Sequence, residues 1–193
     1  MAPPTSSATP TISSTLLAPT AHLVGHSYGA VVALLMAAAA PDTVQSLTVV
    51  EPPVLQPARG VAEVEDAIAR HEELVRLDDP DPVYRGMLRA RGAPEPRRSL
   101  TELERRHVRL LIGERRPWAA ELPLDTLRSA RIPCLILTGW HDPVFELVAD
   151  RLGEQLGPVV TRTIHRGAGH AVQRAPEFNE TVERFWRAAR QRR

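Results

Sequence analysis

The chain of 193 residues contains no lysine, so all 24 of its basic side chains are arginines. This absence excludes a lysine Schiff base, a Ser-Lys catalytic dyad and a phosphate-binding loop that relies on lysine. The cations are balanced by 23 acidic side chains, which leaves a formal net charge of +1. Because so small a net charge creates no global field toward polyanions, we expect neither nucleic acid nor a membrane surface as a partner.

Cysteine and long apolar runs are also scarce. The single cysteine, Cys134, lies in the apolar run 132–137, so no disulfide can form within the chain and a cytoplasmic location is expected. No stretch is apolar enough over sufficient length to span a bilayer. Residues 1–20 are rich in Pro, Ser, Thr and Ala and contain no basic residue, which argues against a secretory signal. We expect them to form a disordered or loosely attached arm.

Short apolar runs alternate with helical patterns along the rest of the chain. The expected strands cover 22–24, 46–50, 134–138 and 159–164, and the expected helices cover 28–40, 145–156 and the segment after Pro176. Alternation of this kind predicts an α/β fold with a mainly parallel sheet flanked by helices.

Residues 54–125 differ from the rest in composition. Arg, Glu and Leu dominate, in helical blocks near 61–76 and 98–114, with a Pro- and Asp-rich break at 79–82. The segment could be a set of amphipathic surface helices, but we interpret it as a helical cap inserted between two strands. The core domain then consists of residues 21–53 and 126–193.

The segment from Gly25 to Gly29 reads Gly-His-Ser-Tyr-Gly and stands between an apolar strand and an alanine-rich helix. Gly-x-Ser-x-Gly in this setting is the nucleophile-elbow pattern, in which a strained turn exposes the serine hydroxyl. The glycines allow close approach of the neighbouring elements, and the helix N-terminus directs its N–H groups at the reacting centre. Ser27 is therefore the predicted nucleophile, and the backbone N–H of Tyr28 is a predicted oxyanion-hole donor.

Partners for the serine follow in the order that this pattern requires. Asp142 follows the third strand and His170 follows the fourth, so both side chains should lie at the carboxyl edge of the sheet, beside Ser27. We expect His170 to act as general base and Asp142 to hold its imidazole in the productive tautomer. Glu51, just past the second strand, is the alternative acid.

Other residues near the predicted site have weaker assignments. His26, Trp140 and Phe145 are candidates for the pocket wall. His141 and His165 also adjoin the predicted site, where we expect them in the pocket wall or behind the triad rather than in it. The histidines and carboxylates show no metal-ligand spacing, and no dinucleotide-binding glycine motif occurs, so neither a metal nor a cofactor is expected.

Four segments together resemble the α/β-hydrolase superfamily. They are 21–29, the Glu-Pro-Pro at 51–53, the Gly-Trp-His-Asp-Pro at 139–143 and the Gly-Ala-Gly-His at 167–170. The chain is most similar to small bacterial hydrolases with a helical cap, a group that includes esterases, lactonases and haloperoxidase-like enzymes. The resemblance implies a Ser-His-acid triad that cleaves an ester, thioester or lactone through an acyl-enzyme, with a small, apolar-leaning substrate under the cap.

The resemblance departs from the family pattern upstream of the elbow. In this family several strands precede the serine, but only 26 residues precede Ser27, fewer than one βαβ unit requires. We therefore expect a partial fold whose strand at 22–24 presents an open edge, with possible self-association through it. Loss of a second oxyanion donor from that region would lower kcat by about 10²–10³. The alternative function is accordingly an impaired hydrolase remnant or a non-catalytic binding module.

Overall fold

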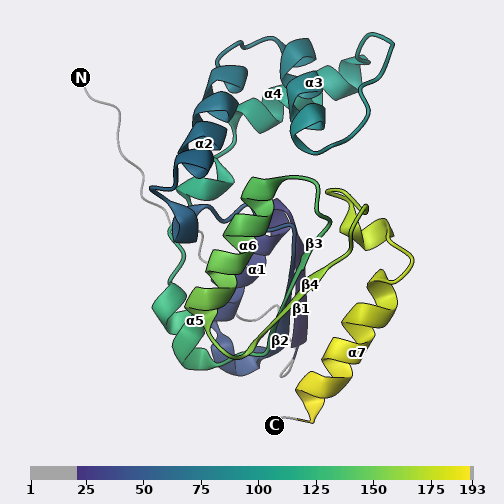
Figure 1. Ribbon diagram of the computed structural model, residues 1–193. Helices are drawn as coiled ribbons and strands as arrows, with labels where there is room; N and C mark the ends of the chain where they lie inside the picture. The colour runs from purple at the N-terminus through teal and green to yellow at the C-terminus, as the bar shows by residue number, and fades with distance from the viewer. Residues whose placement is uncertain (1–20, 192–193) are drawn as a thin grey trace, which may run out of the picture.

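The computed structural model describes residues 21–191, so the predicted arm at 1–20 lies outside the described residues. Four strands form one sheet in the order β1-β2-β3-β4, and every neighbouring pair is parallel. The strands are β1 (Ala21–His26), β2 (Val44–Val50), β3 (Cys134–Thr138) and β4 (Val160–Ile164). The predicted α/β organisation with a parallel sheet is confirmed (Figure 1).

Helices cover both faces of this sheet (Figure 1). One face is covered by α1 (Tyr28–Ala39), α5 (Leu124–Ala130) and α6 (Pro143–Leu156), which share the largest hydrophobic cluster with the strands. Alanines at the buried positions of α1 let the helix axis approach the sheet closely. The opposite face is covered by α7 (Phe178–Arg190), whose Val182 packs with Val50 and Leu137.

Three further helices lie between β2 and β3, in the residues predicted to form an insertion. They are α2 (Ala62–Val75), α3 (Pro80–Ala90) and α4 (Glu102–Gly113). Val75, Val83, Met87 and Val108 give them a small hydrophobic cluster of their own. Figure 1 shows them stacked above the carboxyl ends of the strands, and we call residues 54–125 the helical insertion.

The prediction of a break at 79–82 was wrong, because α3 begins there. Asp79 caps the helix, with its carboxylate accepting a hydrogen bond of 3.1 Å from the N–H of Asp81. Pro80 occupies the first turn, where a missing N–H is tolerated and the fixed φ favours the helix. The Asp-Pro sequence at 79–80 thus starts a helix, and α2 has already ended at Val75.

Within the part of the chain that the structure describes, β1 is an edge strand of the sheet. Among residues 21–191 it pairs with β2 alone, and the Val24 side chain is 47% exposed. In that same span, no helix is both long enough and apolar enough to cross a membrane.

Candidate active site

Ser27 sits in a strained turn between β1 and α1. Its φ of 54° and ψ of −124° lie in a region that residues with a side chain rarely adopt. The turn is fixed by two backbone hydrogen bonds, from the N–H of Ser27 to the Val50 carbonyl at 2.9 Å and from the N–H of Ala30 to the Ser27 carbonyl at 2.8 Å. The backbone therefore has the sharp strand-to-helix geometry that presents a serine hydroxyl.

The two glycines of the pentapeptide differ in their steric role. A Cβ on Gly25 would lie 2.2 Å from the carbonyl oxygen of Gly29, so only glycine fits there. A Cβ on Gly29 would meet nothing within 4 Å. The close approach between the strand end and the first turn of α1 thus depends on Gly25.

His170 lies on the loop after β4, and two contacts hold that loop against the strand ends. The His26 Nε2 atom donates a hydrogen bond of 2.8 Å to the His170 carbonyl, and the two imidazole centroids are 4.8 Å apart. A Cβ on Gly139 would lie 1.9 Å from the carbonyl oxygen of Gly169, so the loop passes directly over the end of β3.

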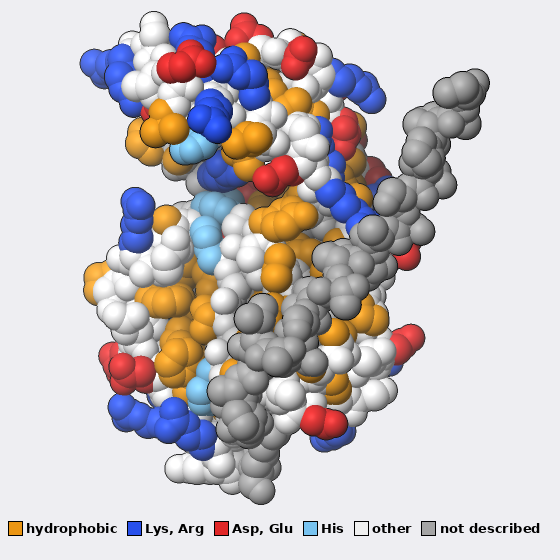
Figure 2. Space-filling view, turned by 180° about the vertical axis from the view of Figure 1, so that it is seen from behind, with side chains coloured by type: hydrophobic (Ala, Val, Ile, Leu, Met, Phe, Trp, Pro, Cys, Tyr) orange, Lys and Arg blue, Asp and Glu red, His pale blue; other side chains and the backbone are white. Residues whose placement is uncertain are grey.

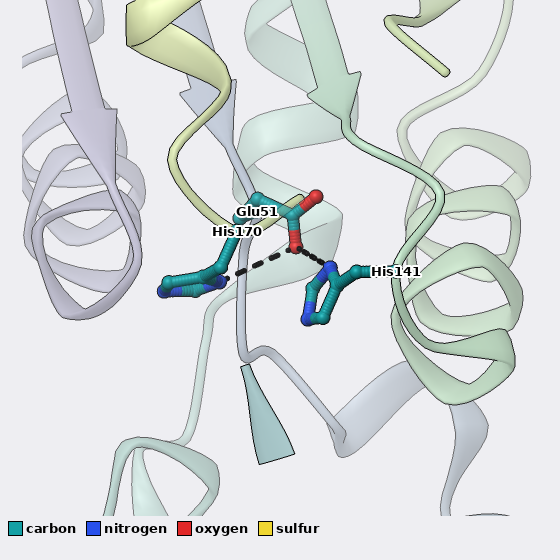
Figure 3. A group of neighbouring side chains, drawn as sticks. All are labelled: Glu51, His141 and His170. Carbon is teal, nitrogen blue, oxygen red and sulfur yellow. Dashed lines mark ion pairs between the residues drawn. The ribbon is translucent and has the colours of Figure 1, made fainter. Parts of the chain in front are cut away.

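Glu51 is fully buried and faces two imidazoles (Figure 3). Its Oε2 atom lies 3.5 Å from Nδ1 of His170 and 3.2 Å from Nδ1 of His141. Its Oε1 atom accepts a hydrogen bond of 2.5 Å from the N–H of Gly139. Burial opposes ionisation of Glu51, but the two imidazoles and the Gly139 N–H outweigh it and hold the pKa at about 2.

Asp142, the acid preferred on the sequence, is placed differently. Its Oδ1 atom accepts a hydrogen bond of 2.8 Å from the N–H of Val144 and so caps the N-terminus of α6. Within the described part of the chain, no ion pair of 4.0 Å or less joins Asp142 to His170. The expected contact between these two residues is absent. The carboxylate that faces His170 belongs to Glu51, the alternative acid. The physical reason is the Asp-Pro sequence at 142–143, which favours a helix cap.

A cavity of about 190 Å³ connects the serine and the histidine. Ser27, Tyr28, Phe145 and His170 line it from the core, and Met87, Leu111 and Trp118 are among the residues that line it from the helical insertion. Histidine side chains gather where the two parts of the molecule meet (Figure 2). A wider depression of about 700 Å³ beside β4 is lined by neither Ser27 nor His170.

Of the remaining residues predicted from the sequence, two line the cavity and two do not. Tyr28 is the first residue of α1, so its N–H has no acceptor within the helix and is free to face the cavity. Phe145 lines the cavity, whereas His26 and Trp140 are not among its lining residues. Trp140 is 51% exposed and carries the Arg166 guanidinium over its ring at 3.8 Å.

The sequence placed His141 beside the predicted site but did not identify it as a partner of Glu51. A signal was present, because His141 and Glu51 both follow apolar runs that were predicted to be strands of one parallel sheet. The structure adds that Ser27, Glu51 and Trp140 all have positive φ at the ends of β1, β2 and β3. Backbone strain of this kind gathers at functional sites.

Among known proteins, one family model matches most of this chain. The model of the alpha/beta hydrolase family matches residues 6–180. No curated protein matches the chain significantly.

Several solved structures share the fold. A carboxylesterase of the thaumarchaeon Nitrososphaera gargensis is 14% identical with a TM-score of 0.60, over 91% of this chain and 67% of that one. NosK from Streptomyces actuosus is 26% identical with a TM-score of 0.53, over 89% and 70%. A putative lipase from Acinetobacter baumannii is 19% identical with a TM-score of 0.55, over 89% and 62%. The chain thus spans about two thirds of the length of these structures.

The parallel sheet, the strained serine turn at the end of β1 and the family match over most of the sequence agree with one another. The chain belongs to the α/β-hydrolase family and has part of its fold.

Proposed function

We propose that this protein is a serine hydrolase that cleaves an ester, thioester or lactone through an acyl-enzyme. The observation that carries the proposal is the strained Ser27 turn, which shares one cavity with His170. Family membership supports hydrolytic chemistry, and neighbours described as a carboxylesterase and a putative lipase favour an ester-like bond.

In the proposed reaction, the Ser27 hydroxyl attacks the substrate carbonyl while Nε2 of His170 accepts its proton. The N–H of Tyr28, at the start of α1, donates to the oxyanion that forms. Collapse of the tetrahedral intermediate releases the leaving group, which takes the proton from His170. A water molecule then attacks the acyl-enzyme with the same histidine as base, and Ser27 is regenerated.

We assign the acid role to Glu51. Its carboxylate faces Nδ1 of His170 and is held ionised, so it can fix the tautomer with the proton on Nδ1 and stabilise the imidazolium. Asp142 is the alternative acid, and it would have to leave the α6 cap to reach His170.

The proposed substrate is small, because the cavity holds about 190 Å³. Met87, Leu111, Trp118 and Phe145 supply apolar surface for an acyl chain. The helical insertion contributes much of this lining, so in our proposal it acts as the cap that selects substrates.

A fluorophosphonate probe tests the proposal, because it reacts with an activated serine. We expect the wild-type chain to be labelled and to hydrolyse p-nitrophenyl acetate, and Ser27→Ala to lose both properties. Ser129→Ala, at an exposed serine of α5, is the matched control and should behave like wild type. Absence of labelling in well-folded wild-type protein would overturn the hydrolase proposal in favour of a non-catalytic module.

The rate of turnover separates an efficient enzyme from an impaired one. If an oxyanion donor is lacking, labelling of Ser27 persists while kcat lies about 10²–10³ below that of a complete site. A burst of p-nitrophenol followed by slow release would locate the defect in hydrolysis of the acyl-enzyme.

A further inference from the structure

Three ligand atoms converge at the carboxyl edge of the sheet (Figure 3). They belong to Glu51, His141 and His170 and all lie within 4.8 Å of one another. Glu51 is at the end of β2, His141 follows β3 and His170 follows β4, so three adjacent strands supply one ligand each. The side chains of His141 and His170 are 4% and 12% exposed, and that of Glu51 is fully buried.

This cluster has more polar atoms than a catalytic acid and base require. Among residues 21–191, Oε2 of Glu51, both nitrogens of His141 and Nδ1 of His170 are buried without a well-directed hydrogen bond. Leaving such atoms unpaired costs free energy, since each has lost its contact with water. A triad uses one imidazole beside its carboxylate, so His141 is surplus to it.

We propose that Glu51, His141 and His170 form a binding site for a transition-metal dication of the Zn²⁺ type. Two imidazoles and one carboxylate are a known zinc-ligand set, with water in the fourth position. Bonds of about 2.0–2.2 Å in tetrahedral geometry place neighbouring ligand atoms about 3.4 Å apart. The observed separations from Oε2 to the two Nδ1 atoms are 3.2 Å and 3.5 Å.

The surroundings of the carboxylate favour the same geometry. The N–H of Gly139 holds the other oxygen of Glu51, which fixes the direction of Oε2. The nitrogen ligands favour Zn²⁺ over Mg²⁺ and Ca²⁺, which prefer oxygen donors. Sequence spacing could not reveal this site, because its ligands lie in three separate loops.

Binding of the ion would switch off the proposed hydrolase, and this consequence rests on the proposed function. The metal displaces the proton from Nδ1 of His170, and Nε2 takes up a proton in its place, so the imidazole stays neutral overall. With Nε2 protonated, the ring no longer accepts the proton of Ser27. The metal is therefore an inhibitor in this proposal, and its removal restores hydrolysis.

Zinc titration of the metal-free wild-type chain against a chelating indicator tests the site. We expect one tight equivalent, and Glu51→Gln, His141→Ala and His170→Ala should each weaken it at least about tenfold. His107→Ala removes an exposed histidine of α4 and serves as the matched control, with unchanged affinity. Excess Mg²⁺ should not compete. Equal zinc affinity in wild type and His141→Ala would overturn the proposal.

Two further measurements keep the test decisive. Co²⁺ added to the wild-type chain should give the visible absorption of a tetrahedral nitrogen-oxygen site, and a purely octahedral spectrum would contradict the proposal even if a variant fails to fold. Ser27→Ala should bind zinc like wild type. Zinc binding without hydrolysis by wild type would thus refute the proposed function alone, whereas hydrolysis by a wild-type chain that binds no zinc would refute the metal site alone.

Discussion

At the residue scale, Glu51 is a fully buried charge that faces two imidazoles and one backbone N–H. An isolated carboxylate at this depth would be neutral, since burial raises its pKa. The partners instead hold the pKa at about 2, so the group is ionised at neutral pH. A buried acid of this kind is suited to orienting a histidine.

The first prediction compares the two candidate acids. Glu51→Gln should lower kcat by about 10²–10⁴, because an amide no longer selects the productive tautomer of His170. Asp142→Asn keeps a residue that caps a helix as well as aspartate does, so it should leave kcat within about tenfold of wild type. Steady-state kinetics with p-nitrophenyl acetate measure both. A larger loss in Asp142→Asn would restore Asp142 as the acid.

The second prediction concerns acid stability. Because the pKa of Glu51 is lowered from 4.5 to about 2 on folding, its ionisation stabilises the fold above about pH 4.5. That contribution, on the order of 3 kcal/mol, is lost as the pH falls toward 2. The difference in unfolding free energy between wild type and Glu51→Gln should therefore shrink over this window in urea titrations. Asp125→Asn, at a 97% exposed side chain, should show a constant, near-zero difference.

The two candidate acids show which features of the site were predictable from the sequence. Both Glu51 and Asp142 follow a strand, so the sequence placed both at the right edge of the sheet. Chain position does not show where a carboxylate points, and the α6 cap that holds Asp142 depends on local backbone geometry. The residues were thus predictable as candidates, and their contacts were not.

At the scale of elements, the site depends on close approaches between backbones. The end of β1 meets the first turn of α1 at Gly25, and the end of β3 meets the His170 loop at Gly139. Neither glycine has positive φ, so crowding alone demands glycine at both positions. The first contact closes the tight turn between two consecutive elements, and the second joins segments that lie 30 residues apart in the sequence.

The third prediction uses these glycines. Gly139→Ala should place a methyl group 1.9 Å from the Gly169 carbonyl and displace the loop that carries His170. We expect a loss of about 1–3 kcal/mol in unfolding free energy, together with a fall in probe labelling. Gly29→Ala, where a methyl group meets nothing within 4 Å, is the matched control. Equal stability of the two variants in denaturant titrations would show that the loop can move without penalty.

The elements themselves were largely readable from the sequence. Hydrophobic runs and an alanine-rich helix predicted the alternation of strands and helices. α3 was missed because its prolines were interpreted as a break, although proline in a first turn favours a helix. α5 was missed because seven residues offer too little periodicity to recognise.

At the scale of the whole molecule, β1 is an edge strand in the described part of the chain. Its outer side carries backbone N–H and C=O groups that no other strand within residues 21–191 engages. Val24 adds exposed apolar surface to this edge. Open edges with apolar side chains favour pairing with another chain.

The last prediction is that the chain self-associates through β1. Light scattering across a range of protein concentrations should show a mass that rises above 21.3 kDa. Val24→Arg should shift the molecule toward the monomer, because an arginine on an edge strand disfavours pairing. Val32→Arg is the matched control, since Val32 is an exposed valine on the helix α1 rather than on the strand, and should associate like wild type. If wild type stays monomeric at every concentration, or if both arginine variants associate equally, the contact lies elsewhere and β1 does not mediate it.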